Sequence, residues 1–392
     1  MSRIAGCCRF VWNKALAIQK ERIVHKNRLL SYVQMAALLV EWKKELSYLQ
    51  EAPSQPLQQT LKNLDRALRE SFTKNNPKRF PRFKNRYMRG SFHYPQGNKV
   101  EQTNTRMYLP KIGWVRYRSS KTIEGLVKNV VVSRHCGKWY VSVQVEQEIK
   151  KPDHTSSSAI GLDVGIAKFA TCSDGMAIEP LNSFRRHEQR LAFLQRGLAR
   201  KIKFSQNWFK QKYKISRCHT KISYCRKDFL HKITDAISKN HAIVVMEELK
   251  IANMSRSAKG TIENPGKNVH AKSGLNKAIL DQGWHEFRRQ LEYKMLWRGG
   301  KLIFVNPRNT SRTCSICGHC EEDNRKTQEQ FICLNCDHKD NADLNAAKNI
   351  LAAGLAVIAS GGYDLSQPVK EEPAVLKLNA FHLIQSESSC FS

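Results

Sequence analysis

Acidic residues are scarce in this chain. Its 392 residues include 66 lysines and arginines but only 34 aspartates and glutamates, which gives a formal net charge of +32. Such an excess of positive charge favours a polyanionic partner, most simply nucleic acid. A solvated basic surface without a partner is the alternative, and the clustering of basic with aromatic residues described below argues against it.

Long apolar runs are also absent. No stretch approaches the roughly 20 apolar residues of a membrane-spanning helix, and no apolar run of a signal peptide follows Arg3 and Arg9. The sequence therefore predicts a cytoplasmic protein without a membrane partner, in which paired cysteines bind metal rather than form disulfides. None of the 13 histidines forms a His-apolar-His pair, so the metal motif of a tyrosine transposase is excluded.

The first 150 residues change from a helical to a strand pattern. Apolar residues recur at spacings of 4, 3, 4 and 4 on one helix face, namely Leu57, Leu61, Leu64, Leu68 and Phe72. Residues 1–77 are therefore predicted to form a helical lobe. From about residue 106 the apolar residues alternate with polar ones, which predicts strands with a hairpin turn at 135–138. Residues 78–150 are predicted to be a basic segment followed by a β-domain, and the polar stretch 150–158 a linker.

The second half alternates strands and helices, as α/β domains do. Strands are predicted around Asp163, at 243–247 and at 302–305. One continuous helix is predicted at 277–299, and a long basic helical insert at 185–240. The fold class is thus multidomain α+β. Its predicted parts after the linker are a nuclease-like core at 158–307, a cysteine-rich segment at 308–339, a last helix at 340–355 and a flexible tail at 356–392.

Three acidic residues occupy positions where a carboxylate needs an explanation. Asp163 lies among apolar neighbours, Glu247 ends a second apolar strand, and Asp343 begins the last helix. Taken singly, each could be a turn, strand-end or N-cap acid. An RNase H-like sheet, however, carries three convergent acids on its first strand, its fourth strand and its last helix. Three such acids can hold two Mg²⁺ ions about 4 Å apart. Glu248, predicted on the other strand face, and Asp340, predicted in the preceding loop, are rival acids.

Two Cys-x-x-Cys pairs lie fifteen residues apart, and they consist of Cys314, Cys317, Cys333 and Cys336. This spacing is typical of a structural Cys₄ zinc ribbon with one Zn²⁺. Cys320, His319 and His338 are alternative ligands, and the outer four cysteines are preferred because they build a symmetric ribbon. A ribbon inserted between the last strand and the last helix would position Asp343 at the magnesium site, while its own zinc would be structural.

Two basic segments are candidates for nucleic-acid binding. Residues 78–90 contain no acid and place aromatic residues between their cations, of which Lys78, Arg79, Arg82, Lys84 and Arg86 are the candidate ligands. Residues 200–232 contain eleven basic residues against one acid, and the candidates are Lys210, Lys214 and Arg226. Cations can contact phosphates and aromatic rings can stack on bases. An exposed linker is the alternative for the first segment, whereas a solvated helix face would normally mix charges.

Several motifs occur together between residues 5 and 352. They are GCCRFVWNKAL, FPRFK, GLDVGIAKFAT, CRKDFLHKIT, VVMEELKIANM, KSGLNKAILDQGWHEFRRQLEYK, NTSRTCSICGH and CLNCDHKDNADLNAAKNI. In combination they resemble the TnpB family, also called OrfB, of insertion-sequence proteins similar to type V CRISPR effectors. The resemblance implies an N-terminal helical recognition lobe, a wedge-like β-barrel from about 106 to 149, and an RNase H-like (RuvC) nuclease domain with an inserted zinc ribbon.

The resemblance also implies an activity, namely an RNA-guided DNA endonuclease encoded by a transposable element. Its catalytic acids would be Asp163 in GLDVG, Glu247 in VMEEL and Asp343 in the Asp-x-Asn-Ala-Ala element. Its partners would be a guide RNA from the element end, double-stranded target DNA and a transposase encoded by the same element, in a prokaryotic cytoplasm and at the nucleoid when bound. A transposase that joins strands and a nuclease-silent RNA-guided DNA binder are the alternatives, and the presence of all three acids favours cutting.

Overall fold

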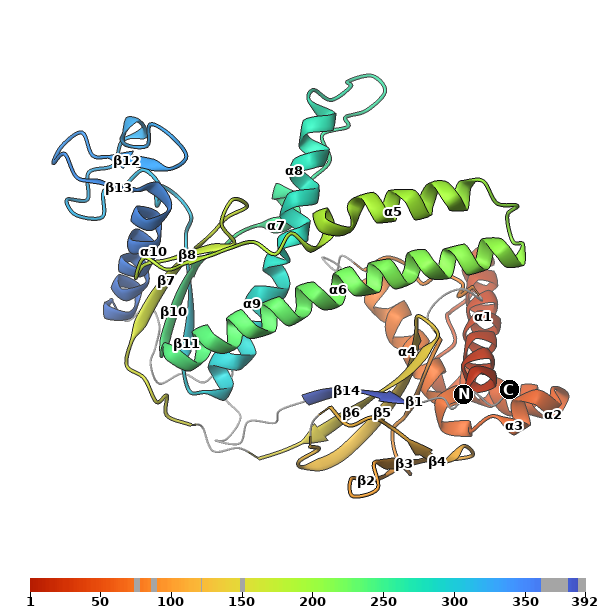
Figure 1. Ribbon diagram of the computed structural model, residues 1–392. Coiled ribbons are helices and arrows are strands. Elements are labelled where there is room, and N and C mark those ends of the chain that lie inside the picture. The colour runs from red at the N-terminus through yellow and green to blue at the C-terminus, as the bar shows by residue number, and fades with distance from the viewer. Residues whose placement is uncertain (74–77, 86–89, 121, 149–151, 361–379, 387–392) are drawn as a thin grey trace. The chain divides into compact units, whose positions relative to one another are not determined.

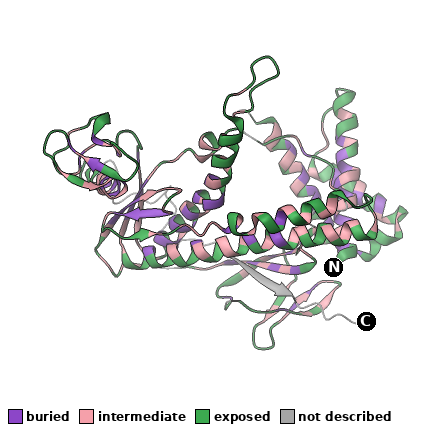
Figure 2. Cartoon of the chain, turned by 45° about the horizontal axis from the view of Figure 1, so that its top comes forward, coloured by how far each residue is buried: buried purple, intermediate pink, exposed green. Residues whose placement is uncertain are grey.

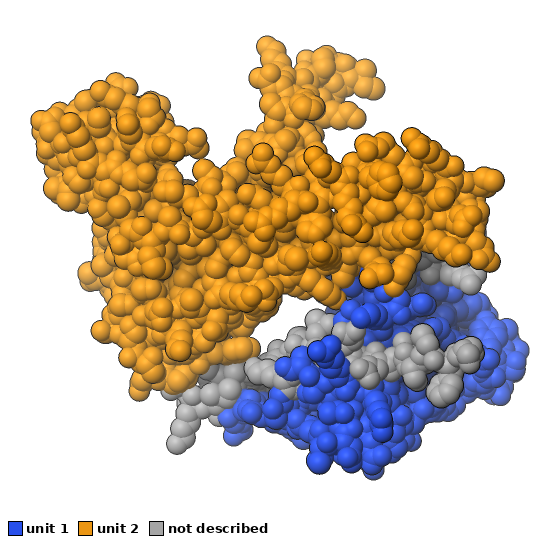
Figure 3. Space-filling view, in the orientation of Figure 1, with its two compact units in different colours: residues 1–149, 375–392 blue, residues 150–374 orange. Residues whose placement is uncertain are grey.

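The chain divides into two compact units. The computed structural model describes residues 1–73, 78–85, 90–120, 122–148 and 152–360, and the backbone of 380–386. Unit 1 comprises residues 1–149 and 375–392, and unit 2 comprises residues 150–374 (Figure 3). The division falls at the start of the polar stretch 150–158.

Unit 1 begins with four helices, α1 (Ser2–Val24), α2 (Tyr32–Glu45), α3 (Ser47–Glu51) and α4 (Ser54–Phe72). The leucine stripe predicted for α4 is buried against α1 and α2, whereas Phe72 at its end is 61% exposed. Ser31 and Gln34 form a capping box that starts α2, since each side chain bonds to the other's backbone N–H. The helical pattern of the first 73 residues is therefore borne out by local chemistry and by packing.

The described strands of unit 1 form two sheets. β1 (Ser91–Tyr94), β5 (Leu126–His135), β6 (Lys138–Glu146) and β14 (Ala380–Ser386) pair in the order β1-β5-β6-β14. β2 (Lys99–Glu101), β3 (Arg106–Leu109) and β4 (Gly113–Arg116) form the second sheet. The predicted hairpin turn joins β5 to β6, and Cys136 and Gly137 both have positive φ, as a tight two-residue hairpin requires.

The tail predicted to be flexible from residue 356 contains regular structure. The last helix, α10 (Ala342–Ala359), runs four residues beyond the predicted end, and β14 pairs antiparallel with β6 over seven residues. β14 covers an edge of β6 that would otherwise leave backbone N–H and C=O groups unpaired. The predicted flexible tail thus contains regular structure at both of these segments.

Unit 2 is built on a five-stranded sheet. Its strands are β7 (Ala159–Val164), β8 (Ala170–Cys172), β9 (Ala177–Ile178), β10 (Ile243–Glu247) and β11 (Lys301–Val305). The order is β11-β10-β7-β8-β9, in which β7, β10 and β11 are parallel and β8 and β9 are antiparallel additions. The first strand therefore lies at the centre, and the fourth strand lies directly beside it.

Helices cover both faces of this sheet (Figure 1). α6 (Gln206–Asn240) and α9 (Trp284–Trp297) cover one face, where Leu162, Met246 and Phe287 share a core. α10 covers the other face at very short range. A Cβ added at Gly161 would lie 2.3 Å from the backbone oxygen of Ala347, so only glycine permits this contact. The remaining helices are α5 (Ser183–Ala199), α7 (Ile251–Met254) and α8 (Val269–Gln282).

The single helix predicted at 277–299 is two helices. α8 ends and α9 begins at Gly283, whose φ of 75° lies in the left-handed region that interrupts a right-handed helix. A Cβ at Gly283 would also lie 3.1 Å from the side chain of Arg226 on α6. The apolar pattern continues across the break, which is why periodicity alone predicted one element.

Helix α10 is apolar enough to be compared with a membrane span. Within the described part of the chain, it alone combines sufficient length with a mean hydropathy of 1.2. Core helices of globular domains share these properties, and α10 packs along β7, β10 and β11. Its apolar character is therefore explained by the sheet that it covers.

Candidate active site and metal centre

Two of the three predicted acids lie side by side on adjacent parallel strands. Met246 of β10 is in register with Leu162 of β7, so the next residues, Glu247 and Asp163, are neighbours at the same ends of their strands. Residues two apart on a strand share a face. Gly161 contacts α10, so Asp163 and its neighbour Glu247 also lie on the face of the sheet that α10 covers.

The third acid is brought to the same place by α10. Asp343 lies one helical turn before Ala347, the residue packed against Gly161, so it extends over the strand end that carries Asp163. The N-cap of α10 is Asn341, whose side chain accepts hydrogen bonds from the backbone N–H groups of Asp343 and Leu344 at 3.1 and 3.3 Å. Asp343 is therefore not used as the cap, and its carboxylate remains available to the site.

The charges of Glu247 and Asp343 both act on Asp163. Burial, together with the charges of Glu247 and Asp343, raises the pKa of Asp163 to about 7, and Arg325 opposes the shift. Burial also raises the pKa of Glu247, against a hydrogen bond of 2.5 Å that Thr310 Oγ1 donates to its Oε1. Three carboxylates near one another, with one cation and one hydroxyl beside them, favour a bound divalent cation.

The donor set suits magnesium more than a softer metal. It offers carboxylate oxygens from three elements and no thiol or imidazole, and Mg²⁺ prefers such hard ligands. Among the described residues, only four cysteines, described below, bring their ligand atoms within 4.8 Å of one another. The carboxylate oxygens of the three acids are therefore spread more widely than those sulfurs. A spread of this kind leaves room for water and substrate oxygens as further ligands.

The rival acids lie outside this group. Glu248 is exposed and follows Glu247 directly, so its side chain alternates to the other side of the strand. Asp340 pairs with Lys348 at 2.7 Å, and this contact lowers the pKa of Asp340 together with a backbone hydrogen bond. Asp340 lies in the short strand β13 (Lys339–Asn341) rather than in the predicted loop, and an acid already neutralised by a lysine is a structural residue there.

Two further residues of the site had no signal in the sequence. Arg325 Nη2 donates to Asp343 Oδ1 at 3.1 Å, and both side chains are about one-quarter exposed. Thr310 contacts Glu247, as described above. Both residues come from irregular loops before the last helix, where periodicity gives no orientation. Their positions depend on the cysteine-rich segment, which connects the sheet to α10.

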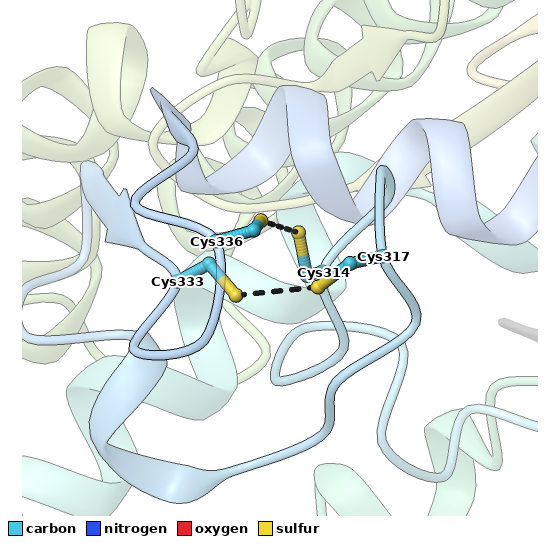
Figure 4. A group of neighbouring side chains, drawn as sticks. All are labelled: Cys314, Cys317, Cys333 and Cys336. Atoms are coloured by element: carbon cyan, nitrogen blue, oxygen red, sulfur yellow. Dashed lines mark hydrogen bonds between the residues drawn. The ribbon is translucent and has the colours of Figure 1, made fainter.

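Four cysteines form a compact cluster in that segment (Figure 4). The ligand atoms of these residues, Cys314, Cys317, Cys333 and Cys336, all lie within 4.8 Å of one another. The Sγ–Sγ distance is 3.7 Å between Cys314 and Cys336 and 3.5 Å between Cys317 and Cys333. Hydrogen bonds, led by one from the backbone at His319, lower the pKa of Cys317 to about 6. Four thiolates in this arrangement match the tetrahedral donor set of structural zinc.

The alternative zinc ligands lie outside the cluster. Cys320 is exposed and pairs through its backbone with Thr313. His319 Nε2 contacts Glu321 Oε2 at 3.0 Å, and the nearest acid to His338 Nε2 is Asp340 at 3.6 Å. The structure thus brings together the four predicted cysteines and none of these three residues.

Two asparagines of α10 attach the cysteine-rich segment to the sheet unit. Asn345 is fully buried, accepts from the backbone N–H of Ser315 and donates to the carbonyl of Thr313. Asn349, one turn later, donates to the carbonyls of Thr310 and Thr313. The Asp-x-Asn-Ala-Ala element therefore serves two purposes along one helix, since Asp343 faces the sheet while the asparagines fix the segment that supplies Thr310.

The basic residues of α6 form an exposed stripe. Its members recur at helical spacing and are all exposed, namely Lys210, Lys214, Arg217 and Lys221. The adjacent face of the helix, with Cys218 and Ile222, packs on α5, and Figure 2 shows exposed residues along both helices. Neither Lys210 nor Lys214 has a carboxylate partner in the described residues. Arg226 differs, because its Nη1 donates to the carbonyls of Leu280 and Asp281 at the end of α8. Arg226 therefore has partners within the protein, and its contact with nucleic acid stays a prediction.

The basic segment after α4 contacts α1 within unit 1. Asn13 bonds to both backbone groups of Lys84, and Trp12 Nε1 donates to the carbonyl of Arg82. Lys78 pairs with Glu70 at 2.7 Å, whereas Arg79 and Arg82 are exposed. Arg86 lies outside the described residues. The segment is thus fixed by its backbone, while several of its cations face solvent.

Comparison with known proteins gives the chain a family. A family model described as "Probable transposase" (OrfB_IS605) matches residues 141–258, one described as "Cas12f1-like, TNB domain" matches residues 284–350, and one described as "Helix-turn-helix domain" matches residues 1–28. A protein of Escherichia coli (strain K12) named "Putative RNA-guided DNA endonuclease InsQ" is 54% identical over 376 residues, which is 95% of this chain and 93% of that protein. The chain belongs to the OrfB family, also called TnpB.

Further similarities agree with membership of the OrfB family. A protein of Streptomyces pristinaespiralis named "Putative RNA-guided DNA endonuclease" is 36% identical over 376 residues, covering 92% of this chain and 87% of the relative. The "Cryo-EM structure of the Cas12f1-sgRNA-target DNA complex" is similar over 89% of this chain and 93% of that chain, at 20% identity and a TM-score of 0.33. A TM-score this low supports no inference about the fold, so the sequence relatives carry the assignment.

Proposed function

We propose that this OrfB protein is an RNA-guided DNA endonuclease that hydrolyses phosphodiester bonds at Asp163, Glu247 and Asp343. The observation that carries the proposal is the convergence of these three carboxylates from β7, β10 and α10, with the charges of the other two raising the pKa of Asp163. The two relatives described above, which match nearly the whole chain, are named for the same activity.

We infer that unit 2 is an RNase H-like (RuvC-like) nuclease core. Numbered within unit 2, its strands follow the spatial order 5-4-1-2-3, with strands 1, 4 and 5 parallel. The acids lie on the first strand, the fourth strand and the last helix, which is the arrangement that this fold uses. The two sheets of unit 1 would form the wedge-like domain, and its helices the recognition lobe.

The residues of the site would act through position and charge. Asp163 and Glu247 would hold cations at the carboxyl ends of adjacent strands, and Asp343 would close the site from α10. Two Mg²⁺ ions bound there would supply an activated water and stabilise the leaving oxygen of the phosphodiester. Thr310 orients Glu247 through its hydroxyl, and Arg325 sets the direction of Asp343 and adds positive charge beside the scissile phosphate. One structural zinc on the four cysteines would fix the loops that carry both residues.

Guide RNA and double-stranded target DNA are the partners that fit this activity. In RNA-guided recognition, base pairing selects the sequence and the protein contacts backbones. The stripe of Lys210, Lys214, Arg217 and Lys221 on α6 suits backbone phosphates, because cations spaced along a helix contact successive charges without reading bases. The exposed Arg79 and Arg82 offer a second set in unit 1.

One experiment separates the candidate activities. The full chain is purified with co-expressed RNA from its element end and incubated with a library of linear DNA duplexes and Mg²⁺. We expect cuts at sites that match the RNA and share a short flanking motif. Joined strands would instead indicate a transposase, and stable binding without cuts would indicate a nuclease-silent binder. Either of these outcomes would overturn the proposal.

The rate of cutting should depend on pH through Asp163. Because the pKa of Asp163 is raised to about 7, its carboxyl is protonated at acidic pH and a cation must displace that proton. We expect the single-turnover rate at limiting Mg²⁺ to rise by about tenfold per pH unit below pH 7 and to level off above it. Raising the Mg²⁺ concentration should move the midpoint to lower pH. A rate that is flat between pH 5.5 and 7 would show that Asp163 is already ionised in the metal-free site.

A further inference from the structure

We propose that a basic cavity in unit 1 binds one backbone phosphate of a nucleic acid. The inference extends the proposed function to a second site, far along the chain from the carboxylates. The cavity has a volume of about 110 Å³ and is lined by Gly6, Arg9, Lys84, Ser91, Arg134 and Trp139, among other residues. These residues come from α1, from the segment after α4, and from β1, β5 and β6, so the cavity lies where the helices of unit 1 meet its sheet.

The wall of the cavity carries positive charge without compensation. Three of its side chains are cations, Arg9, Lys84 and Arg134, and none of its lining residues is acidic. Within the described residues, none of the three cations has a carboxylate partner. The first turn of α1, which forms one side of the cavity, also lacks an acid. Unpaired cations are common in a chain with 66 lysines and arginines and 34 acids, so what sets these three apart is that they line one cavity.

Lys84 is held in place before any ligand arrives. Its backbone is bonded on both sides by Asn13, at 2.9 and 2.8 Å, and its Nζ lies 3.7 Å from the centre of the Trp12 ring. Burial lowers the pKa of Lys84, which means that its charge is poorly solvated. An anion in the cavity would stabilise that charge without a further loss of side-chain conformational entropy, because the lysine is already fixed.

The size and lining of the cavity indicate a phosphate. The volume suits a tetrahedral anion rather than a whole nucleotide. A cavity lined by two arginines and one lysine offers enough donors for the several oxygens of a phosphate, more than the two oxygens of a carboxylate need. The Arg134 guanidinium lies 6.0 Å from the centre of the Trp139 ring, which supports it on one side and leaves its N–H groups for the ligand. With a net charge of +32, the chain makes nucleic acid the natural source of that phosphate.

Inorganic phosphate tests the cavity directly. The probe is sodium phosphate against sodium chloride at equal ionic strength, and the readout is the apparent melting temperature of the full chain. We compare the double variant Arg9→Gln/Arg134→Gln with Lys138→Gln, a matched control that removes an exposed cation beside Trp139 but outside the cavity. A ligand that binds only the folded state raises its stability, so phosphate should raise the melting temperature of the wild type and of Lys138→Gln more than that of the double variant. Equal shifts in all three proteins would overturn the proposal.

Salt dependence identifies the source of the phosphate. Binding of a labelled single-stranded RNA and of a labelled DNA duplex is measured without Mg²⁺ over a range of salt concentrations. Loss of one phosphate contact should reduce the log–log slope by about 0.7 for RNA or by about 0.9 for duplex DNA in the double variant, with no change in Lys138→Gln. The nucleic acid whose slope changes supplies the phosphate. If neither slope changes, the assignment to a nucleic-acid backbone is overturned. Neither measurement requires cutting or a guide, so failure of the proposed nuclease would leave both results interpretable.

Discussion

Replacing Asp163 by asparagine is expected to abolish DNA cutting and to leave RNA and DNA binding nearly unchanged. Asparagine keeps the size of the side chain and removes the charge that a divalent cation would neutralise. Loss of one preorganised charged group from an active site lowers rates by about 10³-fold, and more where the group binds the metal itself. Single-turnover cutting of a guide-matched duplex measures the loss of rate, and filter binding of the same duplex measures the affinity that is retained.

The same substitution should make the metal-free protein more stable at alkaline pH. The pKa of Asp163 is raised from 3.8 to about 7 in the folded state, so the folded protein binds more protons than the unfolded chain between these values. Stability therefore falls as pH rises through this range, and above pH 7 the ionised carboxylate opposes folding in full. Asp163→Asn removes this term, so its melting temperature in EDTA should exceed that of the wild type at pH 8 and approach it at pH 4.

Glu248→Gln is the matched control for a lost carboxylate. It removes a negative charge from the residue next to Glu247, but on an exposed side chain outside the carboxylate group. Cutting should remain close to that of the wild type, whereas Glu247→Gln should lose it as Asp163→Asn does. If Glu248→Gln were as inactive as Glu247→Gln, overall charge near β10 would matter and the assigned roles would be wrong. If Asp163→Asn lost RNA binding together with cutting, its effect would be on folding.

Much of the sheet of unit 2 could be predicted because its strands are buried on both faces. Such strands appear as short apolar runs, and the predicted strands at 243–247 and 302–305 match β10 and β11 within one residue. The helices were predicted less well where conformation rather than burial decides their ends. Gly283 divides α8 from α9 through its positive φ, and an apolar pattern that continues across the break cannot report it.

Long-range pairing was the main feature that the sequence concealed. β14 pairs with β6 across more than 230 residues of chain, and the two sheets of unit 1 stay separate although their strands are consecutive. Alternation predicts that a segment is a strand, but it does not identify the partner of that strand. The sequence therefore predicted strands between 106 and 149 but neither their division between two sheets nor the pairing of β14 within the predicted tail.

The acids of the candidate site could be predicted, whereas their supporting residues could not. Asp163 and Glu247 stand out because a carboxylate in or beside an apolar strand is unusual, and this signal is local. Arg325 and Thr310 reach the site from loops whose course depends on the cysteine cluster. The bond from Arg226 to the end of α8 was missed for the related reason that a basic helix face does not reveal which of its cations bonds to a neighbouring helix end.

Replacing Cys333 by serine is expected to release zinc and to lower cutting by about 10²-fold or more. The segment between β11 and α10 has a small core, in which the buried apolar residues are Cys314, Phe331, Cys333 and Ala342. Two of the four are themselves members of the cysteine cluster, so little apolar burial remains to fold the segment once the metal is lost. Structural zinc in small modules contributes on the order of 10 kcal/mol to folding.

The effect on cutting would pass through the residues that the segment supplies. Arg325 bonds to Asp343 and Thr310 bonds to Glu247, both from within the segment. The sheet itself should survive, because α10 packs on it through Gly161 and Gly354 without help from the cysteines. Limited proteolysis should therefore cleave Cys333→Ser between residues 311 and 340 while leaving the rest of unit 2 resistant.

Cys320→Ser is the matched control, because it removes a cysteine from the same segment but outside the four-sulfur cluster. Zinc measured with a chromogenic chelator after denaturation should be one per chain in the wild type and in Cys320→Ser, and close to zero in Cys333→Ser. Cutting by Cys320→Ser should match that of the wild type. Loss of zinc from Cys320→Ser would replace one of the four assigned ligands. Full cutting by a zinc-free Cys333→Ser would show that Arg325 and Thr310 reach the carboxylates without the metal, and that the ribbon serves another purpose.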